Sequence, residues 1–269
     1  MAEDFIKKPE YAGLFYSSDP DELKEQIDLN MAKVATLGPD FSDIPLRALV
    51  VPSSGFSYCS TTALAAYQKI LHRHYKRVVI LASSHFFSFQ GIALPEEASV
   101  ETLFGAVDID LVAIAKLKDN FNFHFFENAF AKEYSIEVQI PYLQYCLGDF
   151  QVVPLIVGNK INFREVADVI DKIIDDDTLV VVSTNFSHFL NAEEATAADE
   201  HTIQMLQSKD SLSIFKEGQA SAIQALALLN EIALAKHWLP VFTHYSNSTA
   251  GGDDPDSVVG YASLLYLQE

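Results

Sequence analysis

Four short, continuously apolar runs constrain the fold of this chain more than any other feature. They are RALVVP (47–52), RVVILA (77–82), QVVPLIV (151–157) and TLVVVS (178–183). A run that is apolar at successive positions has no polar face, so it predicts a strand that is buried on both sides. Segments of helical period separate these runs. The sequence therefore predicts an α/β fold with a central, mostly parallel sheet flanked by helices.

The helical segments and one closing strand complete this expectation. The segments of helical period are 19–34, 61–74, 108–118, 140–147, 162–174, 192–207 and 220–235. Pro141 fits the first turn of its helix, where a missing N–H costs little. The terminal run SVVGYASLLYL (257–267) alternates like a strand with one drier face and is expected to extend the sheet. No repeat, low-complexity tract or Gly/Ser linker divides the chain, so we predict one domain over residues 1–269.

The charge balance restricts the partners. The chain has 18 Lys and Arg against 37 Asp and Glu, a formal net charge of −19. This charge repels phosphate backbones and anionic lipid surfaces, so we expect neither nucleic acid nor a membrane as a partner. No apolar run approaches the roughly 18 to 20 residues of a membrane span, which predicts a cytoplasmic protein. Cys59 and Cys146 are too few and too far apart for a CxxC motif, and we expect them to be reduced bystanders.

Polar segments follow the four apolar runs. They are SSGFSYCS (53–60), SSHFF (83–87), GNK (158–160) and TNFSHFL (184–190). Because the carboxyl ends of parallel strands lie at one edge of a sheet, these segments should meet there and form a ligand site. Two of the segments supply an imidazole, His85 and His188, which makes both residues candidate metal ligands. Each histidine also fits a simple hydrogen-bonded residue at the end of a strand.

Seven stretches of the sequence, taken in order, resemble the MEMO-like proteins. They are PEYAGLFYSSDPDEL, VVPSSGFSY, ASSH, EYSIEVQIPYLQ, VPLIVG, VVVSTNFSHF and YSNSTAGGDDPDSVVGYAS. The resemblance implies the fold of the class III extradiol dioxygenases, which are non-heme iron enzymes, and a His, His, Cys metal set. For many prokaryotic members it also implies AMMECR-type and radical S-adenosylmethionine proteins as partners. The animal member is a signalling adaptor that binds phosphotyrosine peptides.

Compared residue by residue, the chain departs from the pattern that the resemblance implies. The segment Pro52-Ser53-Ser54-Gly55 stands where the family has Pro-His-Ala-Gly, so the first histidine is missing, whereas His85 keeps the second histidine. Gly251 aligns with the cysteine ligand, and its loop is expected to give it a positive φ. The pocket that the resemblance implies is formed by Ser53, Ser54, His85, Glu133, Tyr134, Asn185, His188 and Gly251.

The changed positions affect the predicted metal chemistry. Glu133-Tyr134 replaces a usual Glu-His pair, and Asn185 replaces an aspartate, while His188 is kept. A serine hydroxyl is a weak donor to a divalent transition metal and glycine supplies no donor, so most of the metal set is missing. Asp253 or Asp254 is a possible stand-in ligand. We expect either no cofactor or a weakly bound divalent iron, copper or zinc.

Three functions remain open on this sequence. The favoured one is a MEMO-like protein whose pocket binds a small molecule or peptide without dioxygenase-type iron catalysis. The second is a metal-dependent enzyme of the extradiol dioxygenase-like superfamily with a rearranged ligand set. The third is a scaffold for a partner protein. Elemental analysis of the purified protein separates the second function from the other two.

Overall fold

The computed structural model describes residues 6–269. The strands are β1 Ile6–Lys7, β2 Leu46–Val51, β3 Arg77–Ala82, β4 Ile92–Leu94, β5 Ser99–Thr102, β6 Gly105–Asp108, β7 Phe123–Phe125, β8 Gln151–Val157, β9 Thr178–Ser183, β10 His188–Leu190, β11 Trp238–Asn247 and β12 Val258–Gln268. The helices, with η marking a 3-10 helix, are α1 Pro20–Val34, α2 Phe56–Tyr67, η2 Gln68–Ile70, α3 Leu111–Leu117, α4 Glu127–Phe130, α5 Tyr134–Glu137, α6 Ile140–Leu147, α7 Phe163–Ile170, η3 Asp171–Ile173, α8 Ala192–Ser208, α9 Ser211–Glu217, α10 Ile223–Lys236 and η4 Ser248–Gly251.

The four apolar runs form the centre of a nine-stranded sheet, as predicted. The strand order is β10-β12-β2-β9-β3-β8-β4-β7, and β11 pairs with β12. Strands β2, β9, β3 and β8 are parallel to one another, and β12 joins them antiparallel to β2. The fold is therefore α/β with a mixed, mostly parallel central sheet. A second, three-stranded sheet of order β1-β5-β6 lies at one side.

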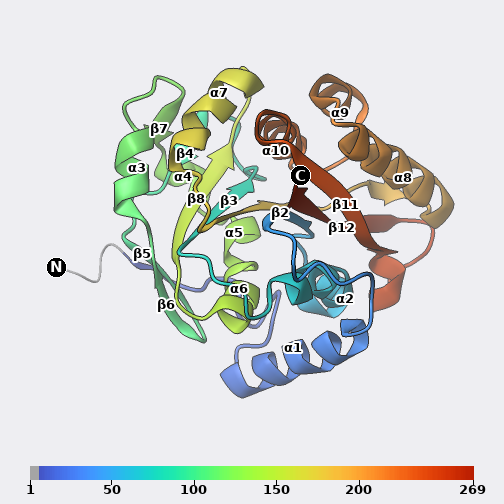
Figure 1. Ribbon diagram of the computed structural model, residues 1–269. Helices are drawn as coiled ribbons and strands as arrows, with labels where there is room; N and C mark the ends of the chain where they lie inside the picture. Colours follow the sequence, from blue (N-terminus) through green and yellow to red (C-terminus); the bar gives the residue numbers. More distant parts are fainter. Residues whose placement is uncertain (1–5) are drawn as a thin grey trace.

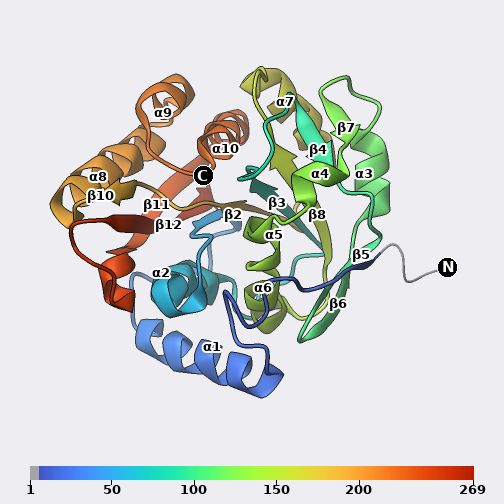
Figure 2. The same ribbon diagram turned by 180° about the vertical axis from the view of Figure 1, so that it is seen from behind.

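Helices cover both faces of the central sheet (Figures 1 and 2). Helices α1, α2, α5 and α6 lie on one face, and α7, α8, α9 and α10 lie on the other. This double cover explains the continuous apolar runs, because a strand between two helical layers has no face in water. Val180 and Val182 are fully buried, which confirms the prediction made from the run that contains them.

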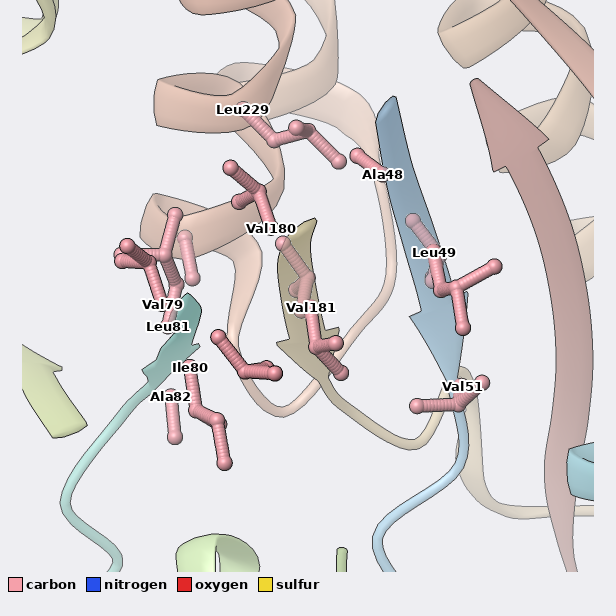
Figure 3. Packing of buried hydrophobic residues seen from close by; sticks show 14 of the residues in the cluster. Ala48, Leu49, Val51, Val79, Ile80, Leu81, Ala82, Val180, Val181 and Leu229 are labelled. Atoms are coloured by element: carbon pink, nitrogen blue, oxygen red, sulfur yellow. The ribbon is translucent and has the colours of Figure 1, made fainter. Parts of the chain in front are cut away.

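The core lies between the central strands and the helices above and below them. Figure 3 shows Leu49 of β2, Ile80 of β3 and Val181 of β9 side by side, with Leu229 of α10 packed over Ala48 and Val180. All of these side chains are fully buried. Each Å² of apolar surface removed from water contributes roughly 25 cal/mol to stability. Burial of these side chains therefore stabilises the central sheet as a rigid platform. The site at its carboxyl edge is held by that platform.

Helix α2 begins earlier than the sequence predicted. The polar segment 53–60 was expected to be a loop and 61–74 a helix, but the helix starts at Phe56 with Gly55 as its N-cap. Phe56, Cys59 and Ala63 are all buried at a helical spacing. The interleaved polar residues of the segment hid this spacing. Cys59 is thus a buried helical residue, and both cysteines are free.

Two features at the end of the chain also differ from the expectation. Strand β12 is buried along nearly its whole length, so the predicted drier face is wrong. The reason is that α2 and α8 both pack against this strand. Strand β11 was not predicted, and Pro240 within it argues against a strand in the sequence. It pairs with β12 alone in register Trp238↔Gln268, and a strand with a single neighbour tolerates proline.

The helices of the described residues include none that is both long enough and apolar enough to cross a bilayer.

The predicted helices can be compared with the observed ones. Pro141 lies in the first turn of α6, as predicted. Several helical predictions extend too far. Segment 61–74 ends at Ile70, in the 3-10 helix η2. Segment 108–118 begins at Leu111 because Asp110 caps the helix. Segment 162–174 tightens into the 3-10 helix η3 after Ile170, and segment 220–235 begins at Ile223.

Candidate functional site

The polar segments after the central strands meet at the carboxyl edge of the sheet. Ser53 follows β2, His85 follows β3, and Asn185 follows β9. Because these strands are parallel, their last residues lie at one edge, and the segments that follow them are joined by hydrogen bonds described below. Hydrogen-bonded groups form there around His85, around Asn185 and around Asp199.

Glu133 fixes the position of His85. Its side chain is 1% exposed, and its Oε1 lies 3.0 Å from His85 Nδ1. Its Oε2 accepts a hydrogen bond from the backbone N–H of His85 at 2.8 Å. The carboxylate also caps α5 by accepting from the N–H of Ser135 at 3.0 Å. Burial raises the pKa of the Glu133 carboxyl, but its contacts with His85 and Ser135 outweigh burial, so its pKa lies below the ordinary value.

Tyr134 occupies the other side of the same imidazole. Its hydroxyl lies 3.1 Å from His85 Nε2, and the two rings stack with centroids 4.7 Å apart. In the neutral tautomer whose Nδ1–H faces Glu133, Nε2 carries the lone pair and accepts from the tyrosine hydroxyl. Burial, followed by the charge of Glu133, raises the pKa of Tyr134, which keeps the hydroxyl a donor. Both ring nitrogens of His85 are therefore engaged.

The N-terminal segment packs over this tyrosine. The Phe15 ring stacks on Tyr134 with centroids 4.6 Å apart, and Tyr11 meets both rings edge-on. Glu137, which is buried in α5, holds the segment by accepting from the N–H of Tyr11 at 2.8 Å and from the hydroxyl of Tyr16 at 2.8 Å. The stack from Phe15 through Tyr134 to His85 is thus built by three distant parts of the chain.

Asn185 joins the segments after β2 and β9. Its Oδ1 accepts from the N–H of Ser53 at 2.9 Å, and its Nδ2 donates to the Ser53 carbonyl at 3.3 Å. Its own N–H donates to Ser221 Oγ at 3.0 Å, which ties this group to the start of α10. Ser53 is fully buried, and its Oγ has no hydrogen-bond partner among residues 6–269. The side-chain amide of Asn185 therefore holds the backbone of Ser53 in place.

His188 lies at the same edge, and Asp199 of α8 holds its neighbour. Asp199 is fully buried and accepts from the N–H of Ser187 at 2.8 Å, from its Oγ at 2.9 Å, and from the hydroxyl of Tyr245 at 2.8 Å. Burial raises the pKa of Asp199. Burial is also the main cause that lowers the pKa of His188.

Gly251 lies beside an aromatic ring. A Cβ at this position would stand 2.1 Å from Cδ1 and 2.6 Å from Cε1 of Tyr58 in α2. The positive φ expected for Gly251 is wrong, because the left-handed glycine is its neighbour Gly252, with φ of 101°. Position 251 is a glycine because the ring of Tyr58 leaves no space for a side chain there. Asp253 and Asp254 follow in an exposed turn, where Asp254 accepts from the N–H of Asp256 at 3.0 Å.

Ser54 contacts the last strand of the sheet. Its Oγ lies 3.2 Å from the hydroxyl of Tyr261 in β12. Burial is the main cause that raises the pKa of Tyr261 to about 12. The two serines that replace the expected histidine segment thus contact different parts of the edge, Ser53 next to Asn185 and Ser54 next to the last strand.

A three-ligand iron, copper or zinc site does not fit the side chains at this edge. Such a site needs three convergent donors, of which His85 offers a nitrogen already facing a hydroxyl and Ser53 offers only an alcohol. Gly251 has no donor and Tyr58 stands where one would project. Within the part of the chain that the structure describes, no three His, Cys, Asp or Glu side chains gather in a way that could hold a metal.

A cavity of about 330 Å³ opens next to His85. Its wall consists of residues 83–89 after β3, residues 157–159 after β8, and Ser221 and Gln224 at the start of α10. Of the predicted pocket residues, His85 lies in this wall, and Asn185 lies behind it through Ser221. Hollows of about 1010 and 500 Å³ elsewhere include His72 and hold none of the predicted site residues.

Sequence reasoning missed several residues of this edge. Asp199 lies four residues after Ala195 and three before Thr202, all on the buried face of α8, so its helical spacing was a usable signal. Tyr58 carried no such signal, because the segment that contains it was expected to be a loop. Ser221 and Gln224 lie at the start of α10, which is far from His85 in the sequence.

The fold and the polar edge define an α/β class of protein with its site at the carboxyl ends of parallel strands. The crystal structure of an uncharacterized protein from Escherichia coli K12 has the same fold, with a TM-score of 0.50 and 13% identity over 82% of this chain and 99% of that chain. At this identity the likeness concerns the fold alone.

The sequence comparison identifies the family. The model of the Memo-like protein family matches residues 7–265, so the chain belongs to this family. Similar relatives include a MEMO1 family protein of Pyrobaculum aerophilum, 28% identical over 98% of this chain and 99% of the relative. MEMO1 family proteins of Aquifex aeolicus (28%, covering 97% and 99%) and Thermoplasma acidophilum (29%, covering 96% and 98%) are similar over nearly their whole lengths as well.

Proposed function

We propose that this Memo-like protein binds a small molecule or peptide at the carboxyl edge of its sheet without dioxygenase-type iron catalysis. The observation that carries the proposal is the engagement of His85 Nε2 by the hydroxyl of Tyr134 at 3.1 Å. A carboxylate on Nδ1, as Glu133 provides, is the usual support of a metal-binding histidine, so Nε2 is the nitrogen that would face a metal. Here that nitrogen faces the Tyr134 hydroxyl.

The surroundings of His85 support the same proposal. A metal would have to displace a hydroxyl whose raised pKa disfavours the phenolate, the form of tyrosine that is a good ligand. The Tyr134 ring is also held from behind by Phe15, so it does not swing away without breaking a stack. The cavity of about 330 Å³ beside His85 is large enough for a small ligand or one side chain of a peptide.

Elemental analysis of protein purified without a metal-affinity tag tests the proposal. We expect iron, copper and zinc far below one equivalent per chain after dialysis, and no rise in melting temperature on adding Zn²⁺. A metal that binds the folded state stabilises it by RT ln(1 + [L]/Kd), where [L] is the free metal concentration. A tight metal site would therefore raise the melting temperature clearly. Stoichiometric metal that survives dialysis would refute the proposal and favour the enzyme with a rearranged ligand set. Asp253→Asn and Asp254→Asn variants would then show whether either carboxylate completes that set.

A further inference from the structure

The short helix α5 and its N-cap hold two separate segments of the chain. Glu133, the N-cap, accepts from the N–H of His85 at 2.8 Å. One helical turn later, Glu137 accepts from the N–H groups of Glu10 and Tyr11 at 3.0 and 2.8 Å. The same turn of helix therefore joins the N-terminal segment to the candidate site.

Residues 11–15 form a strap, a tight turn that lies over α5. Within the strap, the N–H groups of Leu14 and Phe15 donate to the carbonyl of Tyr11 at 3.0 and 2.9 Å. At one end the Tyr11 N–H donates to α5, and at the other the Phe15 carbonyl accepts from the N–H of Phe56 at 2.7 Å. The tip between these ends is open to solvent, since Leu14 is 77% exposed. The strap is therefore a compact unit that is attached at its two ends.

Tyr134 is the contact through which the strap reaches His85. Its ring lies between Phe15 and His85, with centroid distances of 4.6 and 4.7 Å and interplanar angles of 30° and 23°. Both faces of the ring are thereby covered, and in this orientation its hydroxyl lies 3.1 Å from Nε2 of the imidazole. Withdrawal of Phe15 uncovers one face and removes a stacking contact, so the ring gains room to turn away. The position of the strap thus decides how firmly the hydroxyl is held on Nε2.

Glu137 is the latch of the strap. This residue is 1% exposed, and besides the two N–H groups it accepts from the hydroxyl of Tyr16 at 2.8 Å. A buried carboxylate needs such donors, because it has lost those of water. Withdrawal of the strap takes the Tyr11 N–H away from this carboxylate, which opposes opening. The strap is therefore closed in the resting protein and holds Tyr134 against His85.

We propose that the strap is a lid whose opening frees His85. While it is closed, Tyr134 occupies the Nε2 side of the imidazole and Glu133 the Nδ1 side. When it opens, Tyr134 turns away, and Nε2 becomes the nitrogen that accepts a hydrogen bond from a ligand. This device goes beyond the proposed function, because it concerns how the site is opened rather than what the site binds.

The reaction of His85 with diethyl pyrocarbonate tests the inference, since this reagent acylates an imidazole nitrogen that is free. The full chain is treated at neutral pH, and modified His85 is quantified by mass spectrometry, with the exposed side chain of His201 as the reference in the same sample. Tyr134→Phe, which removes the hydroxyl and keeps the ring, should raise the rate at His85 about fivefold, the effect of losing one ordinary hydrogen bond. A wild-type rate in Tyr134→Phe would refute the inference, because the hydroxyl would then not be what restrains His85.

Variants of the strap and of its latch test the lid itself. Phe15→Ala and Glu137→Gln should each raise the rate at His85 about twofold or more, the effect of losing one aromatic contact or one hydrogen bond. Leu14→Ala is the matched control, because this side chain lies in the strap but is 77% exposed, and it should react like the wild type. The half-buried His188 at the same edge should keep its wild-type rate in every variant, which separates opening of the lid from general unfolding. Rates at His85 no higher than in Leu14→Ala, or an equal rise at His188, would overturn the inference.

Discussion

Ser53 contributes backbone to the site, whereas its side chain does not contribute a bond. Its N–H and carbonyl are held by Asn185, and its Oγ is buried without a partner in the described chain. An unsatisfied buried hydroxyl costs about 1 to 3 kcal/mol. We therefore expect Ser53→Ala to leave the free energy of unfolding unchanged or to raise it by about 1 kcal/mol, measured by urea denaturation.

A nearby serine provides the control for this prediction. Ser183 Oγ donates to the carbonyl of Ser135 at 2.6 Å and accepts from Gln139 Nε2 at 2.7 Å. Its replacement by alanine removes the partner of the buried Ser135 carbonyl and of one N–H of Gln139 Nε2, whose other bond goes to the Pro52 carbonyl. Ser183→Ala should therefore lower the free energy of unfolding by about 1 to 3 kcal/mol. A comparable loss for Ser53→Ala would mean that its hydroxyl has a partner after all.

The sequence placed Ser53, His85 and Asn185 directly after central strands but did not indicate what their side chains bind. The position of His85 after a buried strand follows from the strand itself. Its pairing with Glu133 and Tyr134 depends on α5, a four-residue helix with no periodic signal. A helix this short owes its stability to its tertiary contacts, and the caps that hold it are set by distant residues. The same holds for Asn185, whose partners lie more than thirty residues away on either side.

At the scale of elements, η4 and α2 meet so closely that position 251 admits no side chain while Tyr58 is present. The near atoms of Tyr58 belong to the root and side of its ring, which cannot simply bend away. We expect Gly251→Cys to destabilise the protein by about 1 to 3 kcal/mol through overpacking. In a Tyr58→Ala background the same substitution should cost less than half as much.

A double-mutant cycle in urea measures this coupling. Equal costs of Gly251→Cys in the two backgrounds would contradict the steric account. The result also bears on any attempt to build an imidazole and thiolate set with Ser53→His and Gly251→Cys. Because the ring of Tyr58 fills the place of the thiol, those two substitutions need Tyr58→Ala as well.

The sequence specified the elements unequally, for physical reasons. Strands β3, β8 and β9 have the predicted bounds, since a run buried on both faces ends where polarity begins. The beginning of α2 was hidden because polar residues alternate with its buried ones. Strand β11 was hidden because most of its residues are only partly buried and Pro240 interrupts the pattern. Strand β11 forms because it pairs with β12, which comes later in the chain.

At the scale of the whole molecule, two half-buried histidines, His188 and His244, make stability depend on pH. Burial lowers the pKa of His188 from its ordinary value of 6.5, and it lowers the pKa of His244 as well. The folded state therefore binds fewer protons than the unfolded state, and the stability present above about pH 6.5 is lost as the pH falls below it. We expect His188→Gln to lose less stability than the wild type between pH 7.5 and pH 5.5.

The measurement is the melting temperature of both proteins across this pH range. His237→Asn is a suitable control, because His237 is exposed and has the left-handed conformation, φ 57°, that asparagine tolerates. This variant should follow the wild type. The lowered pKa of Glu133 acts at lower pH, below its ordinary value of 4.5, and so does not confuse the result. If the melting temperature of His188→Gln fell with decreasing pH as steeply as that of the wild type, His188 would not contribute to the acid sensitivity.

The contact between Asp199 and Gly260 has a consequence for how this sequence is able to change over time. A Cβ at Gly260 would lie 1.7 Å from Asp199 Oδ2, the oxygen that also accepts from Tyr245 and Ser187. A larger residue at position 260 is therefore accessible only after the carboxylate at 199 has been replaced by something smaller. The opposite order passes through a variant in which strand and helix collide. Descendants of this chain can thus reach the double change along one of the two possible routes, and the helix residue has to change first.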